Sequence, residues 1–294
     1  MGAAWPTRRR SSLSHPPAFV SLTLSPPTRP LGVWATPASA VTDSTLASPV
    51  ALLLYRATAF AFTLAVSLSQ LVRVGPRTLC YFTVWSFSLL AATFGLGTWL
   101  SARRVLRGRV GAWHDGSVDV AGATLIGLLH VALPAALLVV AMTWGVLVPM
   151  LSSPAQPPAV RADTRRLFFN FTSYVQHGAN AGLALGELAL NAIPLHPYLM
   201  GALGAYSSLY GLWAFAFFRA TGRWLYPFLN AHRPWAFAAY AGLYAAHWAF
   251  FGLAVRCWRA RDGLARRLGK RPTVVVDEWA AVDENGFATA KKEE

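Results

Sequence analysis

The chain alternates long apolar runs with short polar or basic clusters, a pattern typical of polytopic helical membrane proteins. Six runs are long enough to cross a bilayer whose hydrocarbon core is about 30 Å thick. They cover residues 51–72, 78–100, 118–150, 168–193, 198–218 and 235–255, and residues 152–166 are predicted to be a loop. The third run is too long for one straight crossing, and Pro134 predicts a kink within it. The pattern therefore predicts an all-α transmembrane helical bundle of about six spans.

Composition and charge support this class. Of the 294 residues, 55% are hydrophobic and 13% are charged, whereas a soluble domain carries about 25% charged residues. The net charge is +14, but the basic residues gather at the ends of apolar runs, where Lys and Arg meet lipid headgroups. We therefore expect the lipid bilayer as a partner and no nucleic-acid binding. Cys80 and Cys257 lie near the ends of predicted spans and do not indicate a disulfide framework.

The chain divides into three predicted parts. Residues 1–48 are rich in Ser, Pro, Thr and Arg, which indicates a disordered cytosolic tail or, alternatively, an organelle transit peptide. Residues 49–258 are predicted to form the six-helix domain, and residues 259–294 a cytosolic C-terminal tail. The basic loop at residues 103–109 and the basic cluster after the last span favour a cytosolic position for both termini.

The chain ends in Lys291-Lys292-Glu293-Glu294. A dilysine at this distance from a cytosolic C-terminus resembles the retrieval signal of endoplasmic reticulum membrane proteins. We therefore expect the protein in the endoplasmic reticulum membrane. The alternative interpretation is a charged chain end without a signalling role.

Polar side chains inside the predicted spans are the candidates for function, since intramembrane ionisable groups are costly unless they have a partner. Four residues of the fourth span fall within an arc of roughly 80° on a helix: His177, Asn180, Glu187 and Asn191. This stripe must face other helices or an aqueous cavity rather than lipid. Arg56 lies one turn inside the first span, and we expect its side chain to extend to the membrane interface.

Three stretches, taken in order on six spans, resemble a known family. They are Tyr81–Trp85 (YFTVW), His177–Asn180 (HGAN) followed by Glu187, and Trp224–Leu229 (WLYPFL). The combination resembles the family that joins the androgen-induced gene membrane proteins to the fly myoblast-fusion protein rolling stone. Leu54–Arg56 (LYR) also fits the rolling stone branch, and the resemblance covers about residues 50 to 258.

The resemblance implies one of two functions, because the two branches of the family differ. The androgen-induced members are intramembrane hydrolases of fatty acid esters of hydroxy fatty acids, with a threonine in the second span and a histidine in the fourth. Thr83 matches that threonine. The hydrolases read His-Gly-x-His in the fourth span, and the second, catalytic histidine is Asn180 here, as in the rolling stone branch. The rolling stone branch implies a non-enzymatic role in membrane organisation or cell fusion.

One catalytic arrangement follows as a hypothesis. Thr83 is the nucleophile and His177 the base that takes its proton, because a threonine hydroxyl is a poor nucleophile until it is deprotonated. Asn180 is an oxyanion donor and Glu187 orients the histidine. The substrate class is a lipid ester. No cofactor is expected, and no metal, because His130, His177, His247 and Glu187 form no close-spaced ligand motif.

Two alternatives stand beside catalysis. The same polar groups can tie helices together, and such intramembrane hydrogen bonds contribute about 0.6 kcal/mol on average. A proton relay through His177 and Glu187 is the other alternative, although the sequence contains no inverted repeat. The sequence does not indicate the oligomeric state.

Overall fold

The computed structural model describes residues 32–108 and 118–270, and every long element in these ranges is a helix. The all-α prediction is confirmed, because residues 32–108 and 118–270 contain no β-strand; Ser44 and Asn191 form an isolated antiparallel bridge. The predicted transit-like start of the chain and the dilysine end lie outside the described residues.

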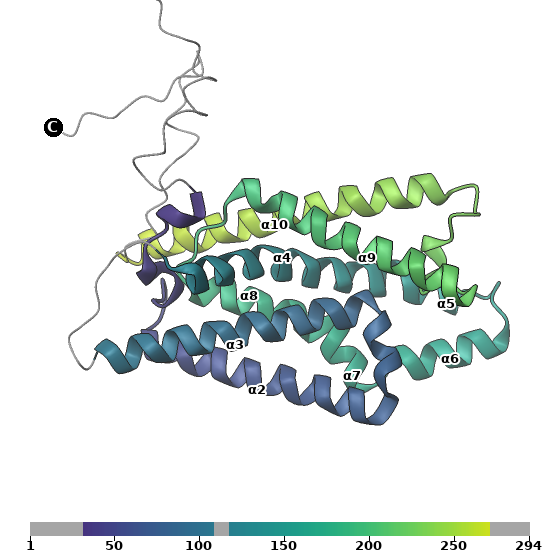
Figure 1. Ribbon diagram of the computed structural model, residues 1–294, viewed down its shortest axis with the longest axis horizontal. Coiled ribbons are helices and arrows are strands. Elements are labelled where there is room, and N and C mark those ends of the chain that lie inside the picture. Colours follow the sequence, from purple (N-terminus) through teal and green to yellow (C-terminus); the bar gives the residue numbers. More distant parts are fainter. Residues whose placement is uncertain (1–31, 109–117, 271–294) are drawn as a thin grey trace, which may run out of the picture. The chain divides into compact units, whose positions relative to one another are not determined.

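The long helical segments follow the predicted apolar runs, and consecutive segments run in opposite directions (Figure 1). Their bounds are α2 Pro49–Val74, α3 Phe82–Gly108, α4 Val120–Met142 with α5 Val148–Ser152, α6 Pro158–Phe168, α7 Phe171–Tyr174, α8 Asn180–Leu190, α9 Met200–Thr221 and α10 Ala236–Arg267. Two π-helical turns, η4 Thr143–Leu147 and η5 Val175–Ala179, join α4 to α5 and α7 to α8. Short 3-10 turns are η1 Gly32–Ala35, η2 Ala38–Val41, η3 Pro76–Cys80, η6 Pro197–Leu199 and η7 Pro227–Leu229.

Four of the described helices are long and apolar enough to cross a membrane: Pro49–Val74, Phe82–Leu106, Val120–Ser152 and Ala236–Arg267. Large apolar side chains are exposed on their outer faces and on α9, for example Leu68 (52%), Leu212 (70%) and Phe237 (86%). Exposed apolar surface of this kind marks a lipid or protein interface. These helices fit an integral membrane protein. The predicted spans 168–193 and 198–218 are helical but are not among the four, so the number of six spans stays a prediction.

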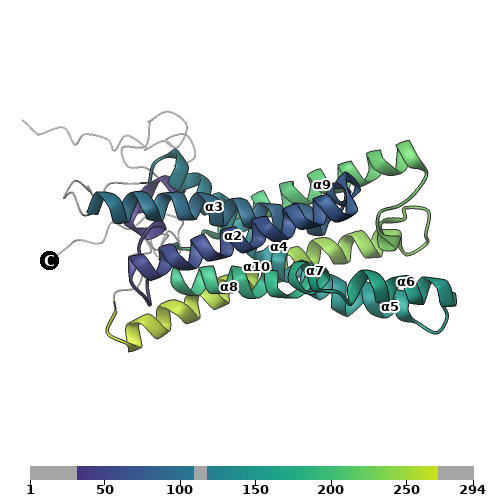
Figure 2. The same ribbon diagram turned by 90° about the horizontal axis from the view of Figure 1, so that it is seen from below.

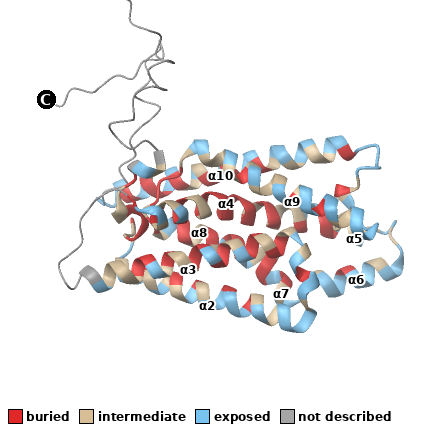
Figure 3. Ribbon diagram, in the orientation of Figure 1, coloured by how far each residue is buried: buried red, intermediate tan, exposed pale blue. Residues whose placement is uncertain are grey.

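The centre of the fold is α4, which packs against α3, α8, α9 and α10. Leu125, Leu129 and Leu133 are completely buried, and Figure 3 shows buried residues along most of this helix. A helix that is apolar all round is stable where neighbouring helices or lipid cover every side, and here neighbouring helices cover most of α4. The Asp119 side chain caps its start by accepting a hydrogen bond from the Gly122 N–H at 2.8 Å. Pro134 lies inside α4, and the departure from α-helical geometry comes later, at η4.

Two segments that were predicted to be a loop or a disordered tail are folded in the structure. Residues 158–168, most of which were predicted as loop, form α6, with Pro158 at the first helical position where its missing N–H costs nothing. Figure 2 shows α6 beside α5. Residues 32–48, predicted as part of a disordered tail, fold as short turns with Thr36, Val41 and Thr45 buried.

The predicted boundary at residue 258 falls inside α10, which continues to Arg267. Arg261 and Asp262 are buried there and form an ion pair at 2.8 Å. The Arg261 guanidinium also donates to the carbonyl oxygens of Leu188 and Ile193, at the end of α8. The Leu188 carbonyl belongs to the last turn of α8, where carbonyl groups have no intrahelical partner, and Ile193 follows the end of that helix.

The expectation that Arg56 extends to the membrane interface is wrong, because this side chain is completely buried in the bundle. Its guanidinium forms an ion pair with Glu187, with Nη2 at 2.5 Å from Oε1, and also donates to the Val41 carbonyl and the Ser101 hydroxyl. Gly97 of α3 makes room for it: a Cβ there would lie 3.1 Å from the Arg56 Cδ atom. A small residue on the facing helix therefore directs the arginine inward.

Candidate functional site

The polar stripe of the fourth span faces the interior, as expected. Asn180, Glu187 and Asn191 are each no more than 1% exposed, and His177 is partly buried. The helix that carries them is not regular, because η5 includes His177 and ends just before Asn180. Asn191 caps the end of α8. The four residues therefore lie in three different local settings, which a regular helical wheel does not represent.

The π-helical turn explains the position of Asn180. In a regular α-helix the Ala181 N–H would bond to the His177 carbonyl. Here the Ala181 N–H bonds to the Asn180 Oδ1 at 2.8 Å, and the His177 carbonyl accepts the Trp144 indole N–H at 2.6 Å. Trp144 itself belongs to η4, so the two π-helical turns contact each other. Asn180 and Trp144 thus supply side-chain partners for the backbone groups around the turn.

We expect Trp144→Phe to destabilise the protein by about 1 kcal/mol, because it leaves a largely buried carbonyl without its donor. The aromatic stacking of this position on Tyr174, with ring centroids 5.7 Å apart, would be retained. Thermal unfolding in detergent would measure the loss. Trp213→Phe is the matched control, since the Cys80 carbonyl that accepts its indole N–H also accepts the Tyr210 hydroxyl. Equal melting temperatures for the two variants would contradict this explanation.

The predicted catalytic residues have separate partners in the structure. The Glu187 carboxylate is bound by Arg56 and by the Asn191 side-chain amide, which is 3.1 Å away. His177 Nδ1 lies 2.9 Å from the Ser173 hydroxyl and 3.0 Å from the Ser173 carbonyl, on its own helical segment. The orienting role predicted for Glu187 is thus filled by Ser173 instead.

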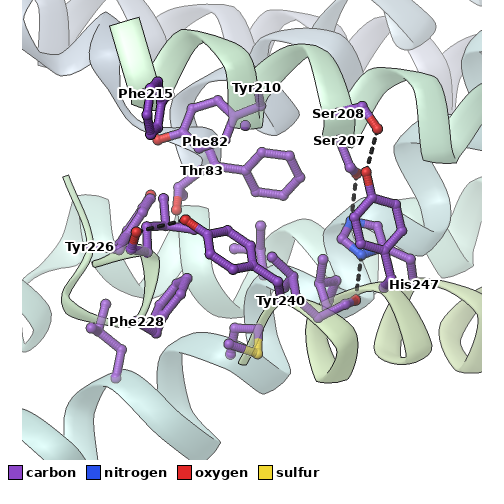
Figure 4. Close-up of a pocket in the computed structure, with 18 of the residues that line it drawn as sticks. Phe82, Thr83, Ser207, Ser208, Tyr210, Phe215, Tyr226, Phe228, Tyr240 and His247 are labelled. Atoms are coloured by element: carbon purple, nitrogen blue, oxygen red, sulfur yellow. Dashed lines mark hydrogen bonds between the residues drawn. The ribbon is translucent and has the colours of Figure 1, made fainter. Parts of the chain in front are cut away.

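Thr83 lines a cavity of about 560 Å³, and His177, Asn180 and Glu187 are not among the residues around it (Figure 4). The cavity lies between the start of α3, the end of α4 with η4, α9, the connection that contains η7, and α10. Its wall consists of Phe82, Thr83, Leu138, Val139, Met142, Thr143, Leu147, Ser207, Ser208, Tyr210, Gly211, Leu212, Phe215, Tyr226, Phe228, Leu229, Ala231, Tyr240, Leu243, Tyr244 and His247.

The wall of this cavity is mainly aliphatic and aromatic, with a few hydroxyl groups. Leu212 and Phe215 line it and are also exposed on the outer face of α9, so one edge of the cavity reaches the surface. Tyr226 lies between α9 and α10. Burial raises the pKa of its phenol, while hydrogen bonding with Thr83 and Tyr210 acts in the opposite direction. The phenol is therefore protonated at neutral pH and can donate a hydrogen bond.

The cavity also contains a hydrogen-bonded serine and histidine. Ser207 Oγ of α9 lies 2.5 Å from His247 Nε2 of α10, and His247 Nδ1 lies 2.6 Å from the Leu243 carbonyl (Figure 4). From the sequence, His247 was weighed only as a possible metal ligand, and Ser207 was not singled out. The sequence signal that could have identified this pair was the presence of a histidine, His247, inside a predicted membrane span. Its pairing depends on a contact between two helices, which no local pattern contains.

Among the residues that the structure describes, no group of three His, Cys, Asp or Glu side chains could hold a metal ion. The chain matches no family model, no curated protein and no solved structure.

Proposed function

We propose that this chain is an intramembrane hydrolase of lipid esters, and that the ester binds in the cavity beside Thr83. The cavity is the observation that carries the proposal. Its volume of about 560 Å³ is within the range of roughly 300–1,000 Å³ that is usual for ligand sites. The aliphatic and aromatic wall suits an acyl chain, and the hydroxyl and imidazole groups suit an ester carbonyl.

The proposal includes membership of the family that joins the androgen-induced gene proteins to rolling stone, and an endoplasmic reticulum location with both termini in the cytosol. The three sequence motifs and the dilysine end support it. Thr83, the residue that corresponds to the threonine of the hydrolases, lines the cavity. The substrate class follows from the same resemblance: fatty acid esters of hydroxy fatty acids.

Filling the cavity is expected to abolish hydrolysis without unfolding the protein. Gly211 lines the cavity, and a Cβ added there meets no atom within 4 Å. We therefore expect Gly211→Phe to occupy the space of the acyl chain and to reduce turnover by about 100-fold or more, since misplacing a substrate by about 1 Å can cost that factor. The probe is an ester of palmitic acid with hydroxystearic acid, and mass spectrometry measures the released hydroxystearic acid.

Gly201→Phe is the matched control for this variant. Gly201 belongs to the same helix and has the same free space around a Cβ, but it does not line the cavity. Hydrolysis should be close to that of the unmodified protein. Equal activity of the two variants would place the reaction elsewhere. A well-folded protein that hydrolyses no lipid ester would favour the non-enzymatic function in membrane organisation or cell fusion.

A further inference from the structure

We propose that Ser207 and His247 are the nucleophile and the general base of this cavity, an inference that rests on the proposed hydrolysis. A serine hydroxyl becomes an effective nucleophile when an adjacent imidazole takes its proton. The Ser207 Oγ and His247 Nε2 atoms are 2.5 Å apart, and both residues line the cavity (Figure 4). They come from different helices, α9 and α10, which meet at this point.

The backbone carbonyl of Leu243 determines which nitrogen of His247 carries the proton. A carbonyl oxygen only accepts hydrogen bonds, so the contact of 2.6 Å with Nδ1 requires a proton on that nitrogen. In the neutral ring, Nε2 then has a lone pair directed at the Ser207 hydroxyl, which donates to it. The carbonyl thus orients the imidazole as the aspartate does in a Ser-His-Asp triad.

The other histidines of the bundle make different contacts, which distinguishes the Ser207–His247 pair from hydrogen bonds that only hold helices together. His130 Nδ1 also bonds to a carbonyl one turn earlier, that of Ile126, at 2.6 Å. Its Nε2, however, accepts the backbone N–H of His196, which cannot serve as a nucleophile. His177 bonds through Nδ1 to Ser173 on its own segment. Among the described histidines of the long helices, His247 is the one whose Nε2 contacts a hydroxyl that belongs to another helix and lies in the cavity.

The neighbouring pair of Ser208 and Tyr244 already provides a tie between α9 and α10. The two hydroxyls form a hydrogen bond one residue along the chain from Ser207, and neither is a base at neutral pH. The cavity therefore contains two serines in similar positions, of which one has an imidazole partner. The hydroxyls of Thr83 and Tyr226 lie on the wall of the same cavity and can donate hydrogen bonds to an oxyanion.

The reaction follows from this geometry with water as the second substrate. Ser207 Oγ forms a bond to the ester carbonyl carbon while its proton moves to His247 Nε2. The acyl C–O bond then breaks, and the Nε2 proton passes to the departing alcohol oxygen, which leaves an acyl group on Ser207. Water attacks this acyl carbon and gives a proton to Nε2. The bond between Ser207 Oγ and the acyl carbon then breaks, the Nε2 proton returns to Ser207 Oγ, and the fatty acid departs.

A fluorophosphonate with an alkyl chain tests the pair in membranes that contain the full chain. We expect the label on the peptide that contains Ser207, and its loss in Ser207→Ala and His247→Gln. Glutamine can still accept a hydrogen bond from Ser207, so a merely structural contact would survive His247→Gln whereas a base would not. Hydrolysis of the palmitic acid ester of hydroxystearic acid should fall by at least about 10³-fold in both variants. Ser67→Ala is the control: its hydroxyl bonds to the Thr63 carbonyl on its own helix α2, and Ser67 does not line the cavity, so labelling and turnover should stay within about twofold.

The outcomes distinguish this inference from the proposed function. Labelling at Ser207 without ester turnover would support the reactive pair and contradict only the substrate class. Turnover that is blocked by Gly211→Phe and by Thr83→Ala, but retained in Ser207→Ala, would overturn the pair while the hydrolase remains. A wild type that shows neither label nor turnover, with a cooperative melting transition, would overturn both.

Discussion

Glu187→Ala is expected to lower the free energy of unfolding by about 3–5 kcal/mol, because it leaves the Arg56 charge buried without its counter-ion. Arg56 is 0% exposed and Glu187 is 1% exposed, and they are joined by a bidentate contact at 2.5 to 3.1 Å. The remaining Arg56 donors reach the Val41 carbonyl and Ser101. The network therefore connects the N-terminal segment, α2, α3 and α8.

The measurement is unfolding in mixed detergent micelles with increasing SDS. Replacing both partners, in Arg56→Met with Glu187→Leu, should recover most of the loss, since apolar residues of similar volume remove both charges together. The partly exposed pair of Arg104 and Asp43, 3.3 Å apart, is the control: Asp43→Ala should cost less than about 1 kcal/mol. If Glu187→Ala also lowers the free energy of unfolding by less than about 1 kcal/mol, the buried pair contributes little to stability.

Asn191→Leu is expected to cost about 3 kcal/mol or more, because several buried groups lose a partner at about 1–3 kcal/mol each. The Asn191 side chain is completely buried, and its amide donates to Glu187 Oε1 at 3.1 Å. Its Oδ1 accepts from Arg261 at 2.9 Å and from the Ile193 N–H at 3.0 Å. This one side chain therefore joins the Arg56–Glu187 pair to the Arg261–Asp262 pair. Leucine has nearly the same shape and makes none of these bonds.

Asn230→Leu is the matched control. Asn230 Oδ1 also accepts the N–H two residues ahead, that of His232, at 3.0 Å, but this bond lies at an exposed loop where water can replace it. The expected cost there is below about 1 kcal/mol, within the range of surface substitutions. The same SDS titration compares the two variants. Similar midpoints would mean that Asn191 does not couple the two ion pairs.

The candidate site was predictable only in part. The Thr83 position was identified from its motif, and it does line the cavity. The stripe that contains Glu187 was expected to face inward, and it does, because a charged group in an apolar span needs a partner. The partner itself was not predictable, since Arg56 is 131 positions away in the chain.

The sequence alone determined where the long helices lie and that the fold is all-α, because the pattern that forms a helix repeats within a few residues of itself. It also determined that four of the long helices among the described residues are apolar enough for a membrane. Only the tertiary structure decided which polar groups meet: Gly97 admits Arg56 to Glu187, and the packing of α9 on α10 brings Ser207 to His247. The reason is physical. A hydrogen bond between helices forms only where the distance from donor to acceptor falls within a range of about 0.5 Å. That distance depends on the separation and rotation of the two helices, which are set by packing along the whole bundle.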